Sequence, residues 1–190
     1  ARRADRVSEG VGGVEGAEGE RGARGLAPAF GAFAWAGGQA LARYVLDHGE
    51  LFAGKRVLDL GSGSGLTAIA AARSGAASVL AADIDTFAIA AIALNAAANG
   101  VELAISGADL LASSPAASDI VLVGDLFYEK PLAARALAFI ERQRQAGALV
   151  LLGDPGRSYL PRPGLARIAR YSVPVGRDLE HMAIKDAPAC

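Results

Sequence analysis

Cysteine and histidine are scarce in this chain of 190 residues. The single cysteine, Cys190, cannot form an intramolecular disulfide bond, and two histidines, His48 and His181, are too few for a histidine-rich metal site. We therefore predict no metal centre. The cysteine usage is compatible with a reducing compartment.

Net charge and long apolar runs are also lacking. The formal net charge of −1 and the isoelectric point near 6.2 give no electrostatic basis for binding nucleic acid or a membrane surface. The most apolar stretch covers residues 86–98 and contains Asn95, so no uninterrupted run is long enough to span a bilayer. We expect no nucleic acid and no membrane among the partners.

Glycine and alanine are abundant, but they are unevenly placed. Residues 1–25 combine Gly, Glu and Arg with few large apolar side chains, so we expect a leader that is disordered or loosely attached. The remaining residues, 26–190, are long enough for one domain with a substantial core. We therefore place the folded domain at residues 26–190.

Short apolar runs alternate with helical patterns along this domain. We expect parallel strands at 56–60, 78–82, 101–105, 119–124 and 148–152. Helices are expected at 40–46, 66–74, 86–98 and 131–145, with Thr86 as a helix cap. Two further candidate strands at one edge, an antiparallel pair, are residues 167–173 and 181–185. The alternation predicts an α/β fold with a doubly wound, mostly parallel seven-stranded sheet.

A glycine-rich loop joins the first expected strand to its helix. Residues 57–65 read VLDLGSGSG, and glycines there let backbone N–H groups approach a ligand closely at a helix N-terminus. A dinucleotide fingerprint would have Gly or Ala where Leu66 stands. Asp83, at the end of the next strand, suits a ribose hydroxyl pair. With Asp59 at the loop entrance, this pattern favours S-adenosylmethionine (AdoMet) over a nicotinamide cofactor. A plain strand-to-helix turn is the structural alternative.

Acidic residues also follow the third and fourth expected strands. Because the carboxyl ends of parallel strands meet at one edge of a sheet, these residues would lie beside the glycine loop. Asp109 could accept a hydrogen bond from an adenine amino group, or could be an ordinary turn aspartate. Asp125 and Tyr128 would lie next to the cofactor's methyl group, although Asp125 could instead cap a turn and Tyr128 could simply pack. Glu129 fits better as an exposed acid in the first turn of a helix.

Two further segments could shape the same cleft. Trp35, the only tryptophan, lies in a Trp-Ala-Gly-Gly stretch that could close one side of the cofactor cleft, or it could be a core anchor. After the fifth expected strand, residues 153–157 read GDPGR. There Asp154 and Arg157 could form the substrate entrance or could pair with each other.

These motifs together resemble those of the electron-transfer flavoprotein β-subunit lysine methyltransferases, a family of seven-strand AdoMet enzymes with bacterial and mitochondrial members. The resemblance covers about residues 28–180. Five stretches carry it: FAWAGGQAL at 33–41, LDLGSGSG at 58–65, ADID at 82–85, GDLFY at 124–128 and GDPGR at 153–157. The leader and the last residues, DAPAC at 186–190, depart from the pattern. A proline in that segment would weaken a central strand.

The resemblance implies a set of site residues. Asp125 and Tyr128 would face the incoming lysine amine, and the Gly61–Gly65 loop, Asp83 and Trp35 would hold AdoMet. The full set of cofactor-binding residues that we predict is Trp35, Asp59, Gly61, Ser62, Gly63, Gly65, Asp83, Ile84, Asp109 and Gly124. The implied partner is a protein, the electron-transfer flavoprotein β subunit, and the enzyme would be a monomer. Its location would be the bacterial cytoplasm, or the mitochondrial matrix in a eukaryote.

Three functional hypotheses remain open from the sequence. The first is an AdoMet-dependent protein-lysine N-methyltransferase. The second is an N-methyltransferase acting on a small molecule. The third is a nicotinamide-dependent oxidoreductase or a binding module without catalysis, against which Leu66 and the DLFY stretch at 125–128 both argue.

Overall fold

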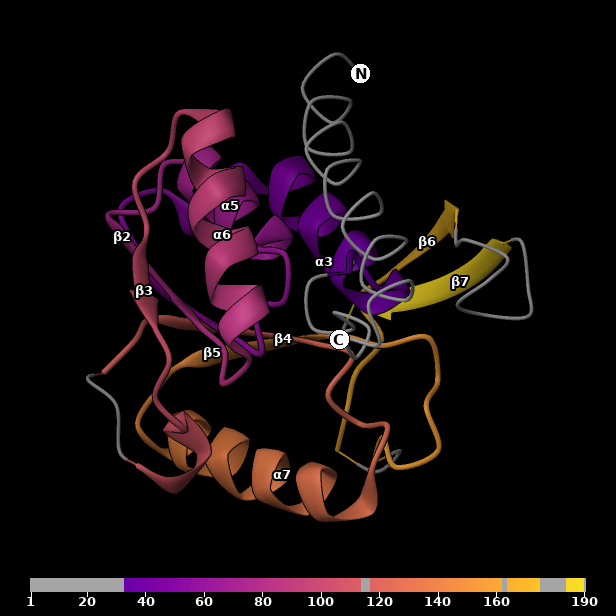
Figure 1. The fold of residues 1–190 in the computed structure, drawn as a ribbon. Helices are drawn as coiled ribbons and strands as arrows, with labels where there is room; N and C mark the ends of the chain where they lie inside the picture. The colour runs from indigo at the N-terminus through magenta and orange to yellow at the C-terminus, as the bar shows by residue number, and fades with distance from the viewer. Residues whose placement is uncertain (1–32, 114–116, 162–163, 175–183, 190) are drawn as a thin grey trace, which may run out of the picture.

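The computed structural model describes residues 33–113, 117–161, 164–174 and 184–189, which form one seven-stranded sheet with helices on both faces (Figure 1). The strands are β1 (Arg56–Leu60), β2 (Ser78–Ala82), β3 (Ala104–Ser106), β4 (Ile120–Gly124), β5 (Leu149–Gly153), β6 (Ala169–Pro174) and β7 (Ile184–Ala189). Their order in the sheet is β3-β2-β1-β4-β5-β7-β6. The predicted leader, residues 1–25, lies outside the described residues.

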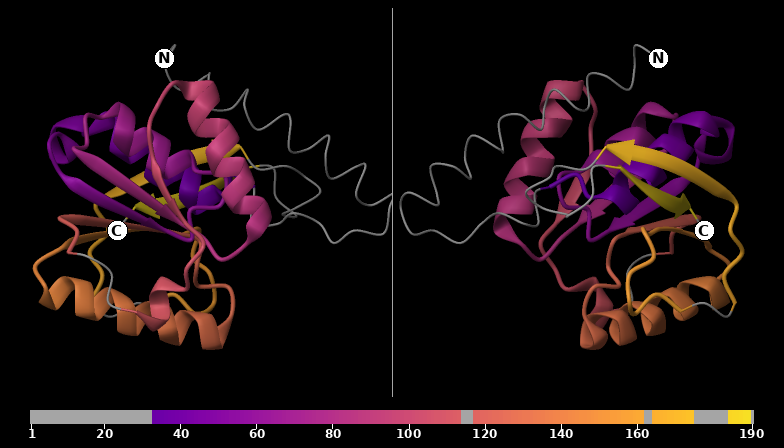
Figure 2. Two further views of the ribbon diagram at one scale, coloured as in Figure 1. Left: turned by 60° about the vertical axis from the view of Figure 1, so that its left-hand side comes forward. Right: turned by 90° about the vertical axis from the view of Figure 1, so that its right-hand side faces the viewer.

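Five strands run parallel and carry the site. Strands β3, β2, β1, β4 and β5 pair in parallel, whereas β7 runs antiparallel to both β5 and β6. This topology confirms the predicted doubly wound sheet with an antiparallel pair at one edge. Within that pair the inner strand, β7, is the one that runs against the rest. Figure 2 shows the pair beyond the parallel strands.

Helices cover the two faces of the sheet unequally. They are α3 (Ala36–Asp47), α4 (Gly49–Phe52), α5 (Leu66–Arg73), α6 (Thr86–Asn99) and α7 (Lys130–Gln145), and a short 3₁₀ helix, η2, covers Leu110–Ala112. In Figures 1 and 2, α7 lies on one face, whereas α3, α5 and α6 lie on the other. Each face therefore has its own apolar core.

Alternate residues of each strand supply these two cores. Val57 and Leu122 pack on the α3–α5 side, whereas their neighbours Leu58 and Val123 pack toward α7 and Phe139. Strands β1 and β4 are almost fully buried, as expected for the centre of a parallel sheet covered on both faces. This burial explains why short, mainly apolar runs predicted both strands correctly.

Some predicted boundaries are wrong, each for a local reason. Helix α6 is capped by Asp85, whose carboxylate accepts the N–H of Phe87, so Thr86 is its first residue and not its cap. Strand β3 begins at Ala104 and not at residue 101, and its three residues are largely exposed, which weakens the apolar signal. Strand β7 begins at Ile184; residues 181–183 of the predicted strand lie outside the described residues.

The short join between β5 and β7 limits the effect of the proline in the last strand. The pairing of β7 with β6 includes six residue pairs, from Ala169↔Ala189 to Pro174↔Ile184, whereas the pairing with β5 is Gly153↔Ala189 alone. Pro188 cannot donate a backbone hydrogen bond, and it lies one residue outside that single pair with β5. Helix α3 also holds strands β6 and β7 to the rest of the molecule, because it contacts both of them.

Candidate active site

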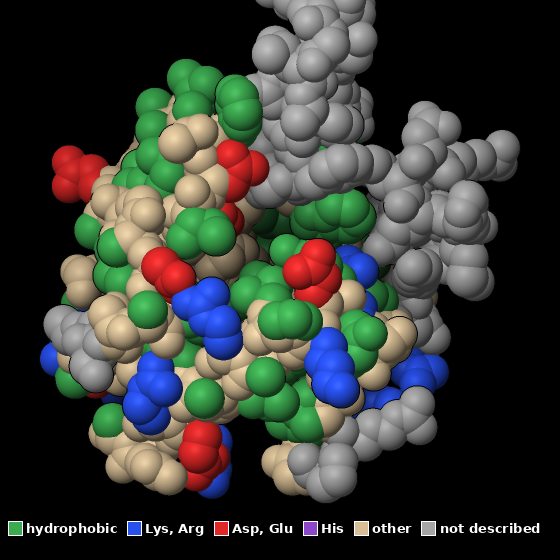
Figure 3. Space-filling view, turned by 60° about the horizontal axis from the view of Figure 1, so that its bottom comes forward, with side chains coloured by type: hydrophobic (Ala, Val, Ile, Leu, Met, Phe, Trp, Pro, Cys, Tyr) green, Lys and Arg blue, Asp and Glu red, His purple; other side chains and the backbone are tan. Residues whose placement is uncertain are grey.

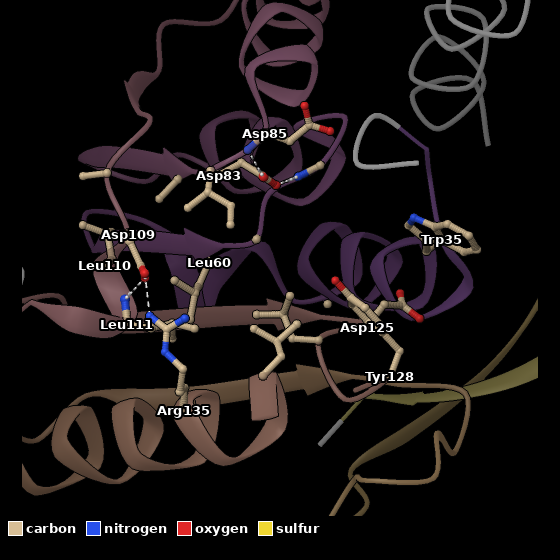
Figure 4. A pocket seen from close by; sticks show the side chains of 18 of the residues that line it. Trp35, Leu60, Asp83, Asp85, Asp109, Leu110, Leu111, Asp125, Tyr128 and Arg135 are labelled. Carbon is tan, nitrogen blue, oxygen red and sulfur yellow. Dashed lines mark hydrogen bonds and ion pairs between the residues drawn. The ribbon is translucent and has the colours of Figure 1, made fainter. Parts of the chain in front are cut away.

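A cavity of about 630 Å³ opens at the carboxyl ends of β1, β2 and β4 (Figure 4). A volume of this size is typical of a site for a cofactor or a drug-sized ligand. Most of the predicted site residues line it: Trp35, Gly61, Gly63, Asp83, Ile84, Asp109, Gly124, Asp125 and Tyr128. Leu60, Asp85, Leu110, Leu111, Leu126, Leu132, Arg135 and Arg157 complete much of the wall. Asp59, Ser62 and Gly65 do not line it.

The glycine loop needs its glycines for backbone reasons. Gly61, Gly63 and Gly65 have positive φ values of 67°, 56° and 82°. The backbone of a residue with a side chain would be strained in this conformation. A Cβ on Gly61 would also lie 2.7 Å from Leu126 Cδ2. The N–H groups of Gly61 and Ser62 both donate to Ala82 O, at 2.9 and 3.0 Å. The loop is thereby held against the end of β2.

Asp59 braces this loop from inside the protein. Its Oδ2 accepts the Ser62 hydroxyl at 2.6 Å and the Ala68 N–H at 3.0 Å, and its side chain is buried. Burial raises the pKa of Asp59 to about 6, although both hydrogen bonds lower it. The predicted cofactor role of Asp59 is therefore indirect in this structure, because its carboxylate fixes the loop to the start of α5.

Asp83 joins the loop to the cavity. Its Oδ2 accepts the Gly63 N–H at 2.9 Å, and its Oδ1 accepts the Asp85 N–H at 3.0 Å. Burial raises the pKa of this carboxyl, and the backbone donors oppose the rise. Each carboxylate oxygen retains a further lone pair for a ligand hydroxyl. Ile84, with 71% of its surface exposed, forms an apolar wall beside it.

An ion pair closes one end of the cavity. Asp109 Oδ2 accepts Arg135 Nη2 of α7 at 2.5 Å, and its Oδ1 accepts the Leu111 N–H at 3.2 Å. The Arg135 guanidinium lowers the pKa of this carboxyl. Figure 4 shows this pair at the opposite end from Trp35, Asp125 and Tyr128. The role of Arg135 could not be found from sequence, because the pair joins residues 26 positions apart.

Asp125 occupies the other end in an unusual backbone conformation. Its φ is 56°, which makes it the one non-glycine residue with positive φ in the described part of the chain. Such strain is concentrated at functional sites. The Asp125 N–H donates to Gly153 O at 2.9 Å, and the side chain is 7% exposed. Its Oδ2 accepts the Gly38 N–H at 2.8 Å. Tyr128 lies at the rim, with 55% of its surface exposed.

Arg157 completes this end of the cavity. Its Nη2 and Nε lie 2.9 and 3.2 Å from Asp125 Oδ1, and its Cζ lies 5.6 Å from the centre of the Trp35 ring. Asp154 instead accepts the backbone N–H groups of Gly156 and Arg157, at 2.7 and 2.6 Å. Asp154 and Arg157 are therefore bonded to each other through the Arg157 backbone N–H, whereas the Arg157 guanidinium pairs with Asp125.

The Trp-Ala-Gly-Gly stretch now has a physical explanation. A Cβ on Gly37 would collide with the carbonyl oxygen of Gly153, and a Cβ on Gly124 would lie 3.2 Å from Gly38 Cα. The first turn of α3 therefore lies directly on the ends of β4 and β5. This contact brings Trp35 to the cavity and the Gly38 N–H to Asp125.

Sequence comparisons find methyltransferases among the proteins similar to this chain. The profile of the family described as ribosomal protein L11 methyltransferase (PrmA) matches residues 39–126. The electron transfer flavoprotein beta subunit lysine methyltransferase of Rattus norvegicus is 42% identical over 149 residues, covering 75% of this chain and 58% of that protein. The Homo sapiens protein of that name is 44% identical over 128 residues, covering 66% and 49%.

Over about three quarters of its length, the chain is similar to the electron-transfer flavoprotein β-subunit lysine methyltransferases. It spans a little over half the length of the curated relatives it matches. The resemblance predicted from the motifs is thereby confirmed.

Solved structures confirm the fold of this chain. The ribosomal protein L11 methylase of Lactobacillus delbrueckii subsp. bulgaricus superposes with a TM-score of 0.56 at 24% identity, covering 81% of this chain and 77% of that one. Magnesium protoporphyrin IX methyltransferase of Synechocystis, solved with bound SAM, gives 0.56 at 20% identity, covering 79% and 76%. Both are methyltransferases of this architecture.

In the described part of the chain, no helix combines the length and the apolar character that a membrane span requires. Within the same ranges, no group of three or more His, Cys, Asp or Glu side chains could hold a metal ion.

Proposed function

We propose that this protein is an AdoMet-dependent protein-lysine N-methyltransferase that acts on the β subunit of electron-transfer flavoprotein. The observation that carries the proposal is the match to relatives of that name, at 42% identity over 149 residues. The cavity, with Asp83 on one wall and the Asp125–Tyr128 segment at one end, supports it. The bacterial cytoplasm or the mitochondrial matrix as its location, and a monomeric state, stay predictions.

The residues of the cavity fit AdoMet in size and chemistry. Asp83 offers carboxylate lone pairs suited to ribose hydroxyls, and the apolar side chains of Ile84 and Leu111 suit the faces of an adenine ring. The Gly61–Gly63 turn brings main chain to the cavity wall without side chains in the way. That cofactor supplies a methyl group on a positively charged sulfur, and transfer to a neutral amine leaves a methylammonium and a neutral thioether.

The chain's own residues orient the amine. Asp125 presents a buried carboxylate at the cavity end, held in place by Gly38 and Arg157. The Tyr128 phenol lies at the rim, where it can form a wall or accept a hydrogen bond from the amine. Most of the rate enhancement would come from holding the amine nitrogen at near-attack distance, an effect worth several powers of ten.

Removal of the Asp125 carboxylate should abolish methyl transfer and leave AdoMet binding nearly intact. The test is transfer of labelled methyl from AdoMet into a cell extract, resolved on a gel. We expect one labelled protein band with the wild type and at least a roughly 100-fold weaker band with Asp125→Ala. Asp125→Asn is the matched variant, because asparagine tolerates the left-handed backbone at this position.

AdoMet affinity is measured by calorimetry on the wild type and both Asp125 variants. A variant that binds AdoMet normally but does not transfer the methyl group is folded and lacks only the carboxylate. Full activity of the Asp125→Asn variant would contradict the role of the carboxylate. Label confined to the small-molecule fraction would contradict a protein substrate, and would favour the small-molecule methyltransferase that the sequence leaves open.

A further inference from the structure

The carboxylate of Asp125 already has a cationic partner within the protein. Arg157 donates to its Oδ1 through both Nη2 and Nε, while the backbone N–H of Gly38 occupies Oδ2. The Arg157 side chain is 20% exposed, and its guanidinium also lies over the face of Trp35. An amine that enters this end of the cavity would therefore meet an ion pair and not an isolated carboxylate.

The difference matters for the protonation state of the amine. A lysine side chain has a pKa of ~10.4 in water and must be neutral to attack a methyl group. An isolated carboxylate at ~4–6 Å favours the ammonium form and opposes this deprotonation. A guanidinium beside the same carboxylate cancels that effect, so the burial of the amine is left to lower its pKa.

We propose that Arg157 is a built-in counter-ion that makes the transfer site select the neutral form of the substrate amine. This inference rests on the function proposed above. The ammonium loses its proton to water before attack, the nitrogen then forms the new N–C bond as the S–C bond breaks, and the positive charge ends on the methylated nitrogen. Arg157 acts through Asp125 and is therefore a positioning residue.

Among the charged groups around Asp125, Arg157 is the one that lowers the pKa of the Asp125 carboxyl. Asp154, buried behind it, is negative and raises the pKa of Asp125, as burial also does, whereas Arg157 lowers it. Asp83 and Glu129 face the nearby phenol of Tyr128 and raise its pKa in addition to burial. From α3 the nearest group is the Gly38 N–H, which carries no formal charge. Among the described residues lining the cavity, the other cation is Arg135, which pairs with Asp109 at the far end.

The pH dependence of kcat with purified electron-transfer flavoprotein, at saturating AdoMet, tests this role. In the Arg157→Gln variant the bound amine keeps its proton more tightly and Asp125 also ionises at higher pH. Both effects move the acid limb of the pH profile of kcat to higher pH, by about one pH unit or more. Arg157→Lys keeps the charge and should shift the limb less. Arg135→Gln, which removes the other cavity cation, should lower AdoMet affinity but leave the limb in place.

A binding measurement tests the same role without methyl transfer. n-Butylamine has the alkyl chain and amine of a lysine side chain, and its binding to the protein can be followed by NMR between about pH 7 and pH 11. We expect its affinity for the wild type to rise with pH, at least about tenfold, and its affinity for Arg157→Gln to change much less because that variant accepts the ammonium. This experiment stands even if electron-transfer flavoprotein proves not to be the substrate, which the absence of any transfer by the wild type would show.

Three results would overturn the proposal. The first is an Arg157→Gln variant that loses the same fraction of kcat at every pH, which would indicate a structural role. The second is a loss of AdoMet affinity as large as the loss of transfer, which would place Arg157 on the cofactor. The third is n-butylamine binding with the same pH dependence in the wild type and the variant.

Discussion

At the scale of single residues, the site depends on buried carboxylates whose charge is disfavoured by their surroundings. Asp59, Asp83 and Asp125 all have raised pKa values, with burial as the largest cause in each. The exposed carboxylate of Asp109 shows the opposite shift, because its ion pair with Arg135 outweighs a small desolvation cost. Desolvated acids are typical of catalytic and binding sites, where they are also costly to stability.

Asp59 should make the protein less stable as the pH rises from about 4 to about 6. Its pKa is about 6 in the folded chain against an ordinary value of 3.8, so the native state holds more protons in this range. The free energy of unfolding therefore falls as pH increases through it. In Asp59→Asn, which keeps an oxygen acceptor for Ser62 and Ala68, we expect a visibly flatter slope. Asp125 still contributes in the same direction.

Chemical denaturation of both proteins at several pH values provides the measurement. An Asp59→Asn variant with the same slope as the wild type would mean that Asp59 ionises normally in the folded state. AdoMet binding is the control, because the loop that Asp59 braces should keep its geometry in this variant.

At the scale of elements, the sequence predicted strands well where most of their residues are buried or partly buried, and poorly where they are exposed. The apolar runs of β1, β2, β4 and β5 are predicted within one residue, whereas the exposed β3 is displaced. The rule that ligands bind at the carboxyl ends of parallel strands correctly placed Asp83, Asp109 and Asp125 around one cavity. The partners of the last two, Arg135 and Arg157, follow from long-range packing, which no local pattern encodes.

The contact between α3 and the ends of β4 and β5 predicts that substitution of two neighbouring glycines, Gly37 and Gly38, has very different effects on stability. A Cβ on Gly37 would collide with Gly153 O and lie 2.6 Å from Asp125 Oδ2, whereas among the described residues a Cβ on Gly38 would meet only Thr67 Oγ1, at 3.9 Å. We expect Gly37→Ala to lower the free energy of unfolding by about 1–3 kcal/mol and to reduce methyl transfer. Gly38→Ala should be neutral or stabilising, since alanine favours a helix by about 1 kcal/mol.

Thermal or chemical unfolding of the two variants, beside their transfer rates, measures this contrast. Equal effects of the two substitutions would contradict the close contact between the first turn of α3 and β5. A Gly37→Ala protein with normal stability and normal transfer would do so as well.

At the scale of the whole molecule, positive and negative charges are nearly balanced. On the face shown in Figure 3, acidic and basic side chains are interspersed with hydrophobic ones across the described residues. With a formal net charge of −1, long-range attraction to a polyanion contributes little. Recognition of the proposed protein substrate would therefore come from shape and from the residues around the cavity mouth, where Ile84 and Tyr128 are exposed.

The most direct test of the account is mass spectrometry of purified electron-transfer flavoprotein after incubation with this protein and AdoMet. We predict methyl groups on lysine side chains of the β subunit, located by peptide mapping. Their yield should fall in Asp83→Ala, which loses a carboxylate of the cofactor cavity, and should disappear in Asp125→Asn. An unmodified β subunit, under conditions where the protein binds AdoMet and methylates another acceptor, would contradict the proposed substrate.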